Sequence, residues 1–184
     1  SGLDNVSSRN LSVTGSPSID NGSWSLVGNQ VYGEYQLNSN DNLDNFSISM
    51  RVRIANESER HDSIVSSSKS SGKIGSWQIG MTGSTAIKFS SKQSIDESDS
   101  DDLSLNENIW NHIVLTKSSS NKIKIYTNNS LSETIQLNDW SIEWLRVGTN
   151  RNTANFWKGN IDDIRVYDYV LSTENINTLY QIYK

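Results

Sequence analysis

The 184-residue sequence contains no cysteine and a single proline. The absence of cysteine excludes a disulfide framework, a zinc–thiolate site and a thiol nucleophile. It leaves the cellular compartment open, because a domain with an adequate core can be secreted without disulfides. A chain of this length buries roughly 70% of its unfolded surface, so it needs no covalent crosslink to fold.

Long apolar runs and basic clusters are also missing. No apolar run approaches the roughly 20 residues that a membrane-spanning helix requires, so membrane insertion is not expected. The net charge is −5 and Lys and Arg are dispersed, which argues against a nucleic-acid partner. The chain begins Ser1-Gly2-Leu3, without Met or a signal peptide. We therefore expect a single domain, residues 1–184, excised from a larger protein.

Alternation of apolar and polar residues predicts many β-strands. Every second residue from Phe46 to Ile54 is apolar, and 122–125 alternate in the same way. This period of two is typical of a strand with one buried face. Asn128-Asn129 lies between two such runs and predicts a tight hairpin turn. The further expected strands are 30–37, 62–67, 76–82, 86–91, 108–117, 144–150 and 160–169.

Only the C-terminal segment 171–184 has a helical pattern. Its apolar residues follow the spacing i, i+3, i+4, i+7 from Ile176, and Ser172 or Thr173 is the expected N-cap. Many strands followed by one late helix predict an all-β fold. The expected architecture is a two-sheet antiparallel jelly-roll sandwich with a short C-terminal helix.

Three stretches resemble a known family, in the order that the family has them. They are "FSISMRVRI" (46–54), "WNHIVLTKSSSNKIKIYTNNSLSETI" (110–135) and "FWKGNIDDIRVYDYVLSTENI" (156–176). The last is the most specific, and it is similar to Phe-x-Gly-x-Ile-Asp-Glu-Val-Arg-Ile-Tyr followed by Ala-Leu-Ser. The chain resembles the concanavalin A-like lectin/glucanase superfamily, in its laminin-G-like jelly-roll branch. The resemblance implies the fold, and it implies a glycan binder, an adhesion domain or a spacer.

The acids of the last predicted strand suggest a metal site. Alternation places Asp162 on the core face with Ile164 and Val166, where a carboxylate must be paired, hydrogen-bonded or bound to metal. The resemblance implies a structural Ca²⁺ between this strand and the N-terminal segment. Acceptance of backbone N–H groups without metal is the alternative. The predicted calcium ligands are Asp162, Asp20, Asn21 and the carbonyl of Gly22.

The sequence lacks the features of a hydrolase. Glucanases of the superfamily carry Glu-x-Asp-x-Glu on one strand, with the two carboxylates about 5 Å apart, and this motif is absent. Asp162 and Asp163 are expected to point apart, and Asp163 to pair with Arg165. The acidic segment 96–102 has no apolar anchor, so we expect a solvated loop or a second calcium loop. His112 is expected to pack rather than catalyse.

Aromatic and amide residues suggest a sugar site instead. Trp77 and Trp157 are expected in the core. Alternation sends Trp144 and Arg146 outward, and the amide-rich segment 148–156 adjoins them. An exposed indole beside amide and guanidinium donors suits a pyranose, and an ordinary wet, Asn-rich loop is the alternative. The predicted ligand-binding residues are Trp140, Trp144, Asn150, Arg151, Asn152 and Asn155.

Together these features predict a non-catalytic, lectin-like or cell-surface adhesion module of a larger extracellular protein. Its expected partner is a glycan or cell-surface polysaccharide, and it is expected to be monomeric. A structural or protein-binding spacer without a glycan site is the alternative. An accessory domain of a glycoside hydrolase is the third possibility.

Overall fold

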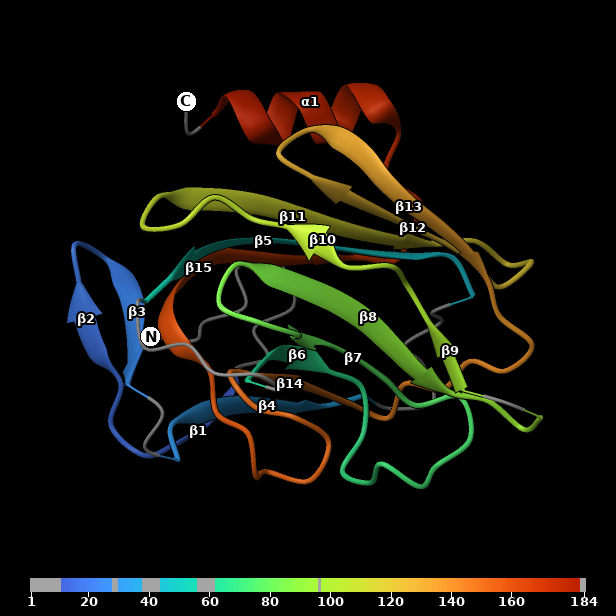
Figure 1. The fold of residues 1–184 in the computed structure, drawn as a ribbon, viewed down its shortest axis with the longest axis horizontal. Coiled ribbons are helices and arrows are strands. Elements are labelled where there is room, and N and C mark those ends of the chain that lie inside the picture. Colours follow the sequence, from blue (N-terminus) through green and yellow to red (C-terminus); the bar gives the residue numbers. More distant parts are fainter. Residues whose placement is uncertain (1–10, 28–29, 38–43, 56–61, 96, 183–184) are drawn as a thin grey trace.

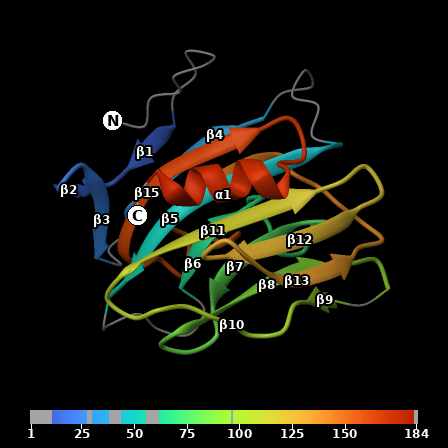
Figure 2. The ribbon, with the colours of Figure 1, turned by 90° about the horizontal axis from the view of Figure 1, so that it is seen from above.

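A computed structural model gives the fold. It describes residues 11–27, 30–37, 44–55, 62–95 and 97–182. Two antiparallel sheets lie face to face, and one helix covers the outer surface of one of them (Figures 1 and 2). The predicted jelly-roll sandwich with a C-terminal helix is therefore confirmed. Among the described residues, none forms a helix long and apolar enough to cross a membrane.

The seven-stranded sheet lies beneath the helix. Its order is β13 (Ser130–Gln136), β12 (Lys122–Thr127), β11 (Trp110–Lys117), β5 (Phe46–Ile54), β15 (Lys158–Tyr167), β3 (Ser23–Val27) and β2 (Ser18–Asp20). The turn between β12 and β13 is the predicted one, because Asn128 and Asn129 have φ of 49° and 69°. Two successive positive φ angles characterise the tight hairpin turn that matches strand twist.

The eight-stranded sheet forms the second layer. Its order is β1 (Ser12–Thr14), β4 (Tyr32–Gln36), β14 (Trp144–Val147), β6 (Ser63–Ser66), β7 (Trp77–Met81), β8 (Ala86–Lys92) and β10 (Leu103–Ser104), with β9 (Glu97–Asp99) paired to β8. The prediction of a loop over 96–102 is wrong at β9. Its pairing with β8 brings Asp99 within 2.8 Å of Lys88, so the acidic segment is held by backbone bonds and an ion pair rather than by apolar anchors.

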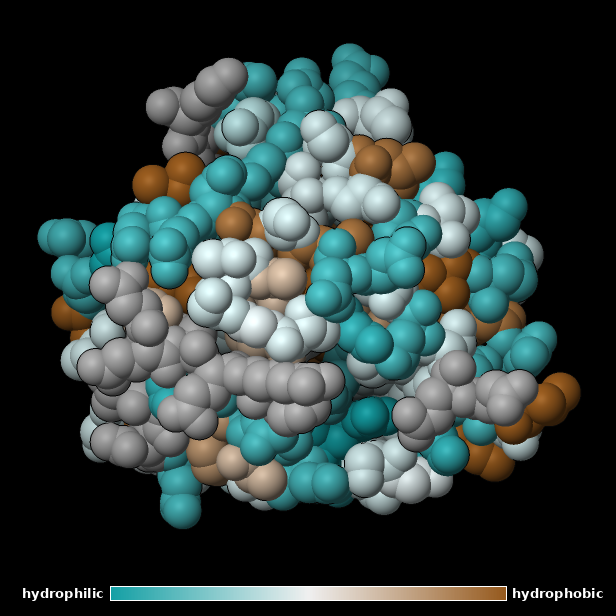
Figure 3. All heavy atoms as spheres, viewed as in Figure 1, coloured by the Kyte–Doolittle hydropathy of each residue, from teal (hydrophilic) through white to brown (hydrophobic). Residues whose placement is uncertain are grey.

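The core lies between the sheets and is organised by β5. The apolar residues of β5 are at most 1% exposed, and β11 and β15 flank this strand on both sides. Trp77 and Trp157 are fully buried, as predicted. Exposed apolar residues are scattered among hydrophilic ones on the surface (Figure 3). The alternation of the strands therefore accounts for one continuous interior.

Strand β15 contains a bulge that the sequence analysis did not anticipate. Asp163 has φ of 49°, and Asp163 and Ile164 of β15 together lie opposite the single residue Met50 of β5. One extra residue reverses the alternation. Ile161 therefore faces the core opposite Val52, while Asp162 lies opposite Arg51 on the outward face. The prediction that Asp162 faces the core is wrong.

The helix α1 (Thr173–Gln181) packs on the outer face of the seven-stranded sheet. Ser172 is the N-cap and forms a capping box with Asn175, as the sequence suggested. Ile176 and Leu179 are buried in a second, smaller apolar cluster that includes Val114, Tyr126 and Leu171. Ser47 of β5 fixes the approach to the helix, because its hydroxyl donates to Tyr169 O and accepts from Leu171 N.

Gly159 provides a test of the junction between β15 and β5. Its φ is 138°, and a Cβ there would lie 2.2 Å from the carbonyl oxygen of Arg53. Gly159→Ala is therefore expected to lower the free energy of unfolding by about 2 kcal/mol or more. Gly83→Ala is the matched control, because its Cβ would meet nothing within 4 Å. Urea unfolding of both variants checks this; equal stabilities would contradict the close approach.

Candidate functional site

The outward face of the eight-stranded sheet collects most of the residues predicted to bind a sugar. Trp144 and Arg146 of β14 point outward as predicted, while Leu145 and Val147 between and beyond them are buried in the core. Arg146 lies opposite Glu34 of β4 on one side and Ser66 of β6 on the other. The centre of this face is therefore polar, with an indole at one end of β14.

A chain of charged contacts connects Arg146 to Trp144. The Arg146 side chain is only 6% exposed, and its Nε donates to Glu34 Oε1 at 2.6 Å. Lys69 Nζ lies 3.4 Å from the second carboxylate oxygen of Glu34. The same ammonium group lies 3.6 Å from the centroid of the half-buried Trp144 ring. A cation so close to an indole face is attracted by the ring quadrupole.

The loop after β14 folds onto this face through Arg151. Arg151 Nη1 donates to the hydroxyl of Ser76 at 2.9 Å and to its carbonyl at 3.2 Å. Arg151 Nε donates to the side chain of Gln78, and Arg151 O accepts from Arg146 Nη1 at 3.0 Å. Arg151 thus attaches the loop to β7 and to the buried arginine.

The loop is also fixed internally and to its neighbour. Asn150 is 8% exposed, and its Oδ1 accepts the backbone N–H groups of Asn152 and Ala154. The Asn152 amide group donates to Ser71 Oγ at 3.1 Å and accepts from Ser71 N at 3.2 Å. Asn155 contributes its carbonyl, which accepts from Ser63 N and Asn150 N. Asn150 and Asn155 therefore shape the loop, and Asn152 joins two loops at the surface.

Trp140 belongs to the core rather than to this face. Its ring stacks on Trp77 with centroids 5.1 Å apart and contacts Phe46 at 6.2 Å. Its indole nitrogen is buried. The sequence placed Trp140 in a loop, which is correct, but a loop residue can still close the end of a core. The indole on this face is that of Trp144, which is partly buried rather than exposed as predicted.

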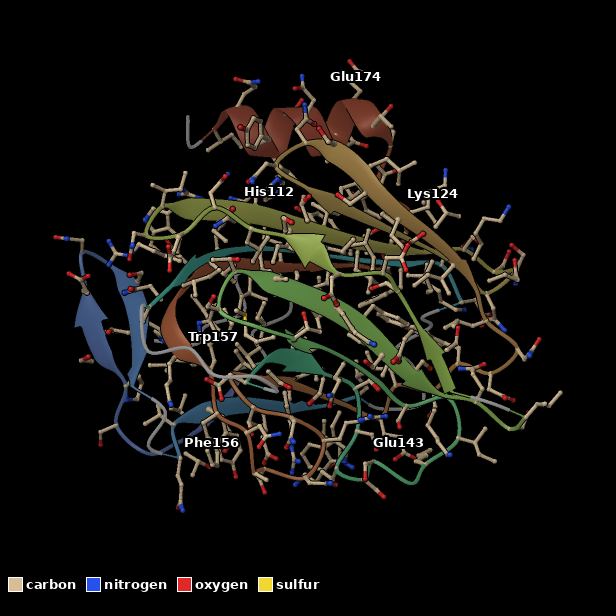
Figure 4. The ribbon with its side chains drawn as sticks, in the orientation of Figure 1. His112, Lys124, Glu143, Phe156, Trp157 and Glu174 are labelled. Atoms are coloured by element: carbon tan, nitrogen blue, oxygen red, sulfur yellow. The ribbon has the colours of Figure 1, made fainter. Side chains whose placement is uncertain are left out.

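We call the surface that these contacts build the Trp144 face. Figure 4 shows it at the lower side of the sandwich, where Glu143 and Phe156 are labelled. Glu143, next to Trp144, pairs with Lys73, so both carboxylates described here have cationic partners. The face presents an indole, an ammonium group, an amide and hydroxyl groups. Its members are Glu34, Lys69, Trp144, Arg146, Arg151 and Asn152.

Of the residues predicted to bind calcium, Asp20 connects the N-terminal hairpin to β15 through an arginine. Asp20 Oδ2 accepts from Arg53 Nη2 at 3.0 Å, and Arg53 also donates twice to Asn160 Oδ1. Asn160 Nδ2 donates to the Ser23 hydroxyl at 3.3 Å. The last strand therefore does hold the beginning of the described chain, through Asn160 and Arg53 rather than through Asp162.

The other proposed calcium ligands have local roles. Asn21 and Gly22 have φ of 48° and 85° and form the turn between β2 and β3. Asn-Gly is typical of such a turn, and the prediction of calcium ligands did not take this signal into account. Asp162 Oδ1 accepts from Asp163 N, and Asp163 pairs with Arg165 as predicted. No three His, Asp or Glu of the described residues cluster to hold a metal, and calcium stays a prediction.

His112 is buried beneath α1 on the outer face of the seven-stranded sheet. Its Nε2 lies 2.9 Å from Ser49 Oγ, and its ring stacks on Tyr180. Its Nδ1 is buried and has no hydrogen-bond partner in the described part of the chain. Burial lowers the pKa of His112 from 6.5 to about 4, assisted by Arg51 and Arg165 and opposed by Asp163. The expected packing role is consistent with this environment.

Comparison with known families gives a match to most of the chain. The family model described as the concanavalin A-like lectin/glucanases superfamily, of laminin G type, matches residues 28–177. No curated protein sequence matches the chain.

Solved structures with the same fold include several binding domains. The binding domain of botulinum neurotoxin DC in complex with SialylT has a TM-score of 0.73 at 20% identity, covering 97% of this chain and 48% of that one. The HCR/D W1238A mutant has a TM-score of 0.75 at 18% identity, covering 98% and 50%. A third structure is titled for the dependence of botulinum neurotoxin type C cell entry on two ganglioside molecules. It has a TM-score of 0.70 at 19% identity, and the match covers 95% of this chain and 47% of that one. The chain thus spans about half the length of these structures.

The depressed pKa of His112 predicts a loss of stability in acid. The unfolded chain binds a proton near pH 6.5, whereas the folded protein does so only near pH 4. Stability is therefore complete above pH 6.5 and falls as the pH drops toward 4. Between pH 7 and 4.5 this costs on the order of 2 kcal/mol.

Urea unfolding at both pH values checks this prediction. His112→Gln is expected to lose correspondingly less stability on acidification, because it removes the titrating group whatever its effect at pH 7. Equal losses in the variant and the unaltered protein would show that His112 is not held neutral by burial.

Proposed function

The chain belongs to the concanavalin A-like lectin/glucanases superfamily, and on this basis we propose that it is a non-catalytic carbohydrate-binding module. The ligand is a glycan or cell-surface polysaccharide, and the module serves recognition or adhesion within a larger extracellular protein. The Trp144 face is the proposed binding surface.

The partly buried Trp144 on the outward face, beside Lys69 and the joined loops, is the observation that carries this proposal. An indole offers an apolar plane to the C–H face of a pyranose, and the surrounding amide, ammonium and hydroxyl groups suit its hydroxyls. Lys69 is 43% exposed on a flexible stem, so it can move from the ring toward a sugar oxygen. The paired loops hold Asn152 and Ser71 in place before a ligand arrives, which reduces the entropy lost on binding.

The structural relatives support a binding role in general terms. One is described in complex with SialylT, and another is titled for interaction with ganglioside molecules. The chain matches only half of each of those structures, and identity is about a fifth, so the similarity supports the fold more than the ligand. The pairing of Glu34 and Glu143 with cations supports a non-catalytic role, since glycoside hydrolysis needs one carboxyl group as acid and another as base or nucleophile.

Trp144→Ala tests the proposed surface. We expect it to weaken glycan binding by about tenfold or more, because the stacking plane is lost. A glycan array identifies the ligand, and titration calorimetry with the best glycan measures the change. Trp110→Ala is the matched control: Trp110 is also partly buried and lies against Arg51 and Arg53, but it belongs to the other sheet.

The outcomes separate the candidate functions. Equal loss in both tryptophan variants would contradict the assignment of the site. A folded protein that binds no glycan would favour the alternative, a structural or protein-binding spacer. Binding restricted to the substrate of an attached glycosidase would favour an accessory domain.

Structural calcium between the first and last strands is a separate proposal. An ion held by Asp20 and Asp162 would have to share Asp20 with Arg53. If calcium binds, millimolar Ca²⁺ is expected to raise the melting temperature and a chelator to reverse the rise, and Asp162→Asn removes the response. A melting temperature indifferent to Ca²⁺ would leave Arg53 as the link between these strands and refute the calcium site.

A further inference from the structure

A concave site lies on the opposite side of the sandwich from the Trp144 face. It is a cavity of about 380 Å³ on the outer face of the seven-stranded sheet, between β11, β12 and the segment that enters α1. This volume lies within the range of about 300–1,000 Å³ typical of small-molecule pockets. Figure 4 shows Lys124 rising from the sheet beside the first turn of the helix.

The strands place two ammonium groups at this cavity. Lys122 and Lys124 are both outward-facing residues of β12, two positions apart, so their Cα atoms are about 7 Å from each other. Lys124 lies opposite Thr116 of β11 in the sheet register. We call this cavity the lysine pocket.

The rest of the pocket wall combines hydroxyls with a small apolar surface. The hydroxyl-bearing residues Thr116, Ser118, Ser120, Ser172 and Thr173 line it. Tyr126, Leu171 and the 42%-exposed Val170 provide the apolar part. Hydroxyl groups both donate and accept, so this wall suits a ligand that is itself rich in hydroxyls.

The positive charge of the pocket is uncompensated. None of its lining residues carries a carboxylate, although the whole chain has a net charge of −5. Within the described residues neither Lys122 nor Lys124 forms an ion pair, whereas Lys69, Lys73 and Lys88 do. Glu174 lies in the first turn of the helix but points away from the sheet (Figure 4). The positive end of the helix dipole adds to the two ammonium groups.

The types of donor indicate the chemistry of the ligand. Lysine binds phosphate as a compact point charge, whereas arginine forms planar, bidentate contacts with carboxylate and phosphate alike. The pocket has two lysines and no arginine. A phosphate monoester carries nearly two negative charges at neutral pH and three acceptor oxygens, which two ammonium groups can share.

We propose that the lysine pocket binds the phosphate ester of a polyhydroxylated molecule, such as a phosphorylated sugar or polyol. The ammonium groups of Lys122 and Lys124 contact the phosphate, and the hydroxyl-lined wall contacts the polyol. The apolar part of the pocket accommodates the C–H face of the ligand. The site is independent of glycan binding at the Trp144 face, which has different residues on the other sheet.

Glucose 6-phosphate is the first probe, with glucose and inorganic phosphate at equal concentration and ionic strength as comparisons. In two-dimensional amide NMR, glucose 6-phosphate is expected to shift signals of the β11–β12 turn and of Thr173. Glucose alone is expected to shift none of these signals, and phosphate to bind about tenfold more weakly because it lacks the polyol contacts. Equal affinity for inorganic phosphate and glucose 6-phosphate would overturn the polyol assignment and indicate an adventitious ion only.

Charge variants assign the binding to the pocket. Lys122→Gln with Lys124→Gln is expected to weaken binding by about tenfold or more, and Arg at both positions to retain part of it. Lys88→Gln with Lys92→Gln is the matched control, because it makes the same charge change on the other sheet. Equal effects of the two Gln pairs would overturn the site.

Two further measurements complete the test. Trp144→Ala is expected to leave glucose 6-phosphate binding unchanged, so failure of one site is distinguishable from failure of the other. Vesicles of phosphatidylcholine with phosphatidylinositol 4-phosphate test a lipid source of the same phosphate. Binding to these vesicles without binding to glucose 6-phosphate would overturn the proposal of a free sugar or polyol.

Discussion

Burial of one face of β5 is the constraint on which the structure depends. Phe46, Ile48, Met50, Val52 and Ile54 lie between the two sheets, and the same strand forms the backbone pairing with β11 and β15. The side chains on the opposite face of β5 then have fixed neighbours, because burying the apolar face also sets the direction of the alternate residues. Serines and arginines of that face reach the helix segment, the buried histidine and the N-terminal hairpin. The interior of the sandwich thus determines what its outer surface can contact.

The two outer faces differ in how their charges are arranged. On the Trp144 face each lysine or arginine of the central network has a carboxylate, carbonyl or ring partner, so these side chains are held in place by their neighbours. On the helix-covered face, Lys122 and Lys124 stand beside hydroxyl groups without a carboxylate among the lining residues of the pocket. An uncharged sugar suits the first arrangement and an anion suits the second. The seven-stranded sheet, which carries α1, therefore has a proposed binding site of its own.

The sequence was sufficient for the fold and for the outward placement of Trp144 and Arg146 in the proposed site. Period-two alternation predicted the long strands, Asn128-Asn129 predicted a hairpin turn, and alternation around Leu145 sent Trp144 and Arg146 outward. The predictions that failed depend on a single irregular residue or on contacts between residues far apart in the sequence. The bulge at Asp163 shifts the strand by one position, and its only local signal is that aspartate tolerates a positive φ. The role of Trp140 depends on stacking against Trp77, 63 positions away, which alternation does not encode.

The bulge divides β15 into two halves of opposite phase. Before it, Asn160 and Asp162 are the outward residues, and Asn160 contacts the N-terminal hairpin. After it, the outward Tyr167 packs on the cluster beneath α1. One extra residue thereby leaves Asn160, Asp162 and Tyr167 on the same outward face, although Tyr167 is an odd number of positions from the other two. Removal of Asp163 would make the ladder regular and leave 165–167 opposite the same residues of β5, but it would also remove the ion pair between Asp163 and Arg165.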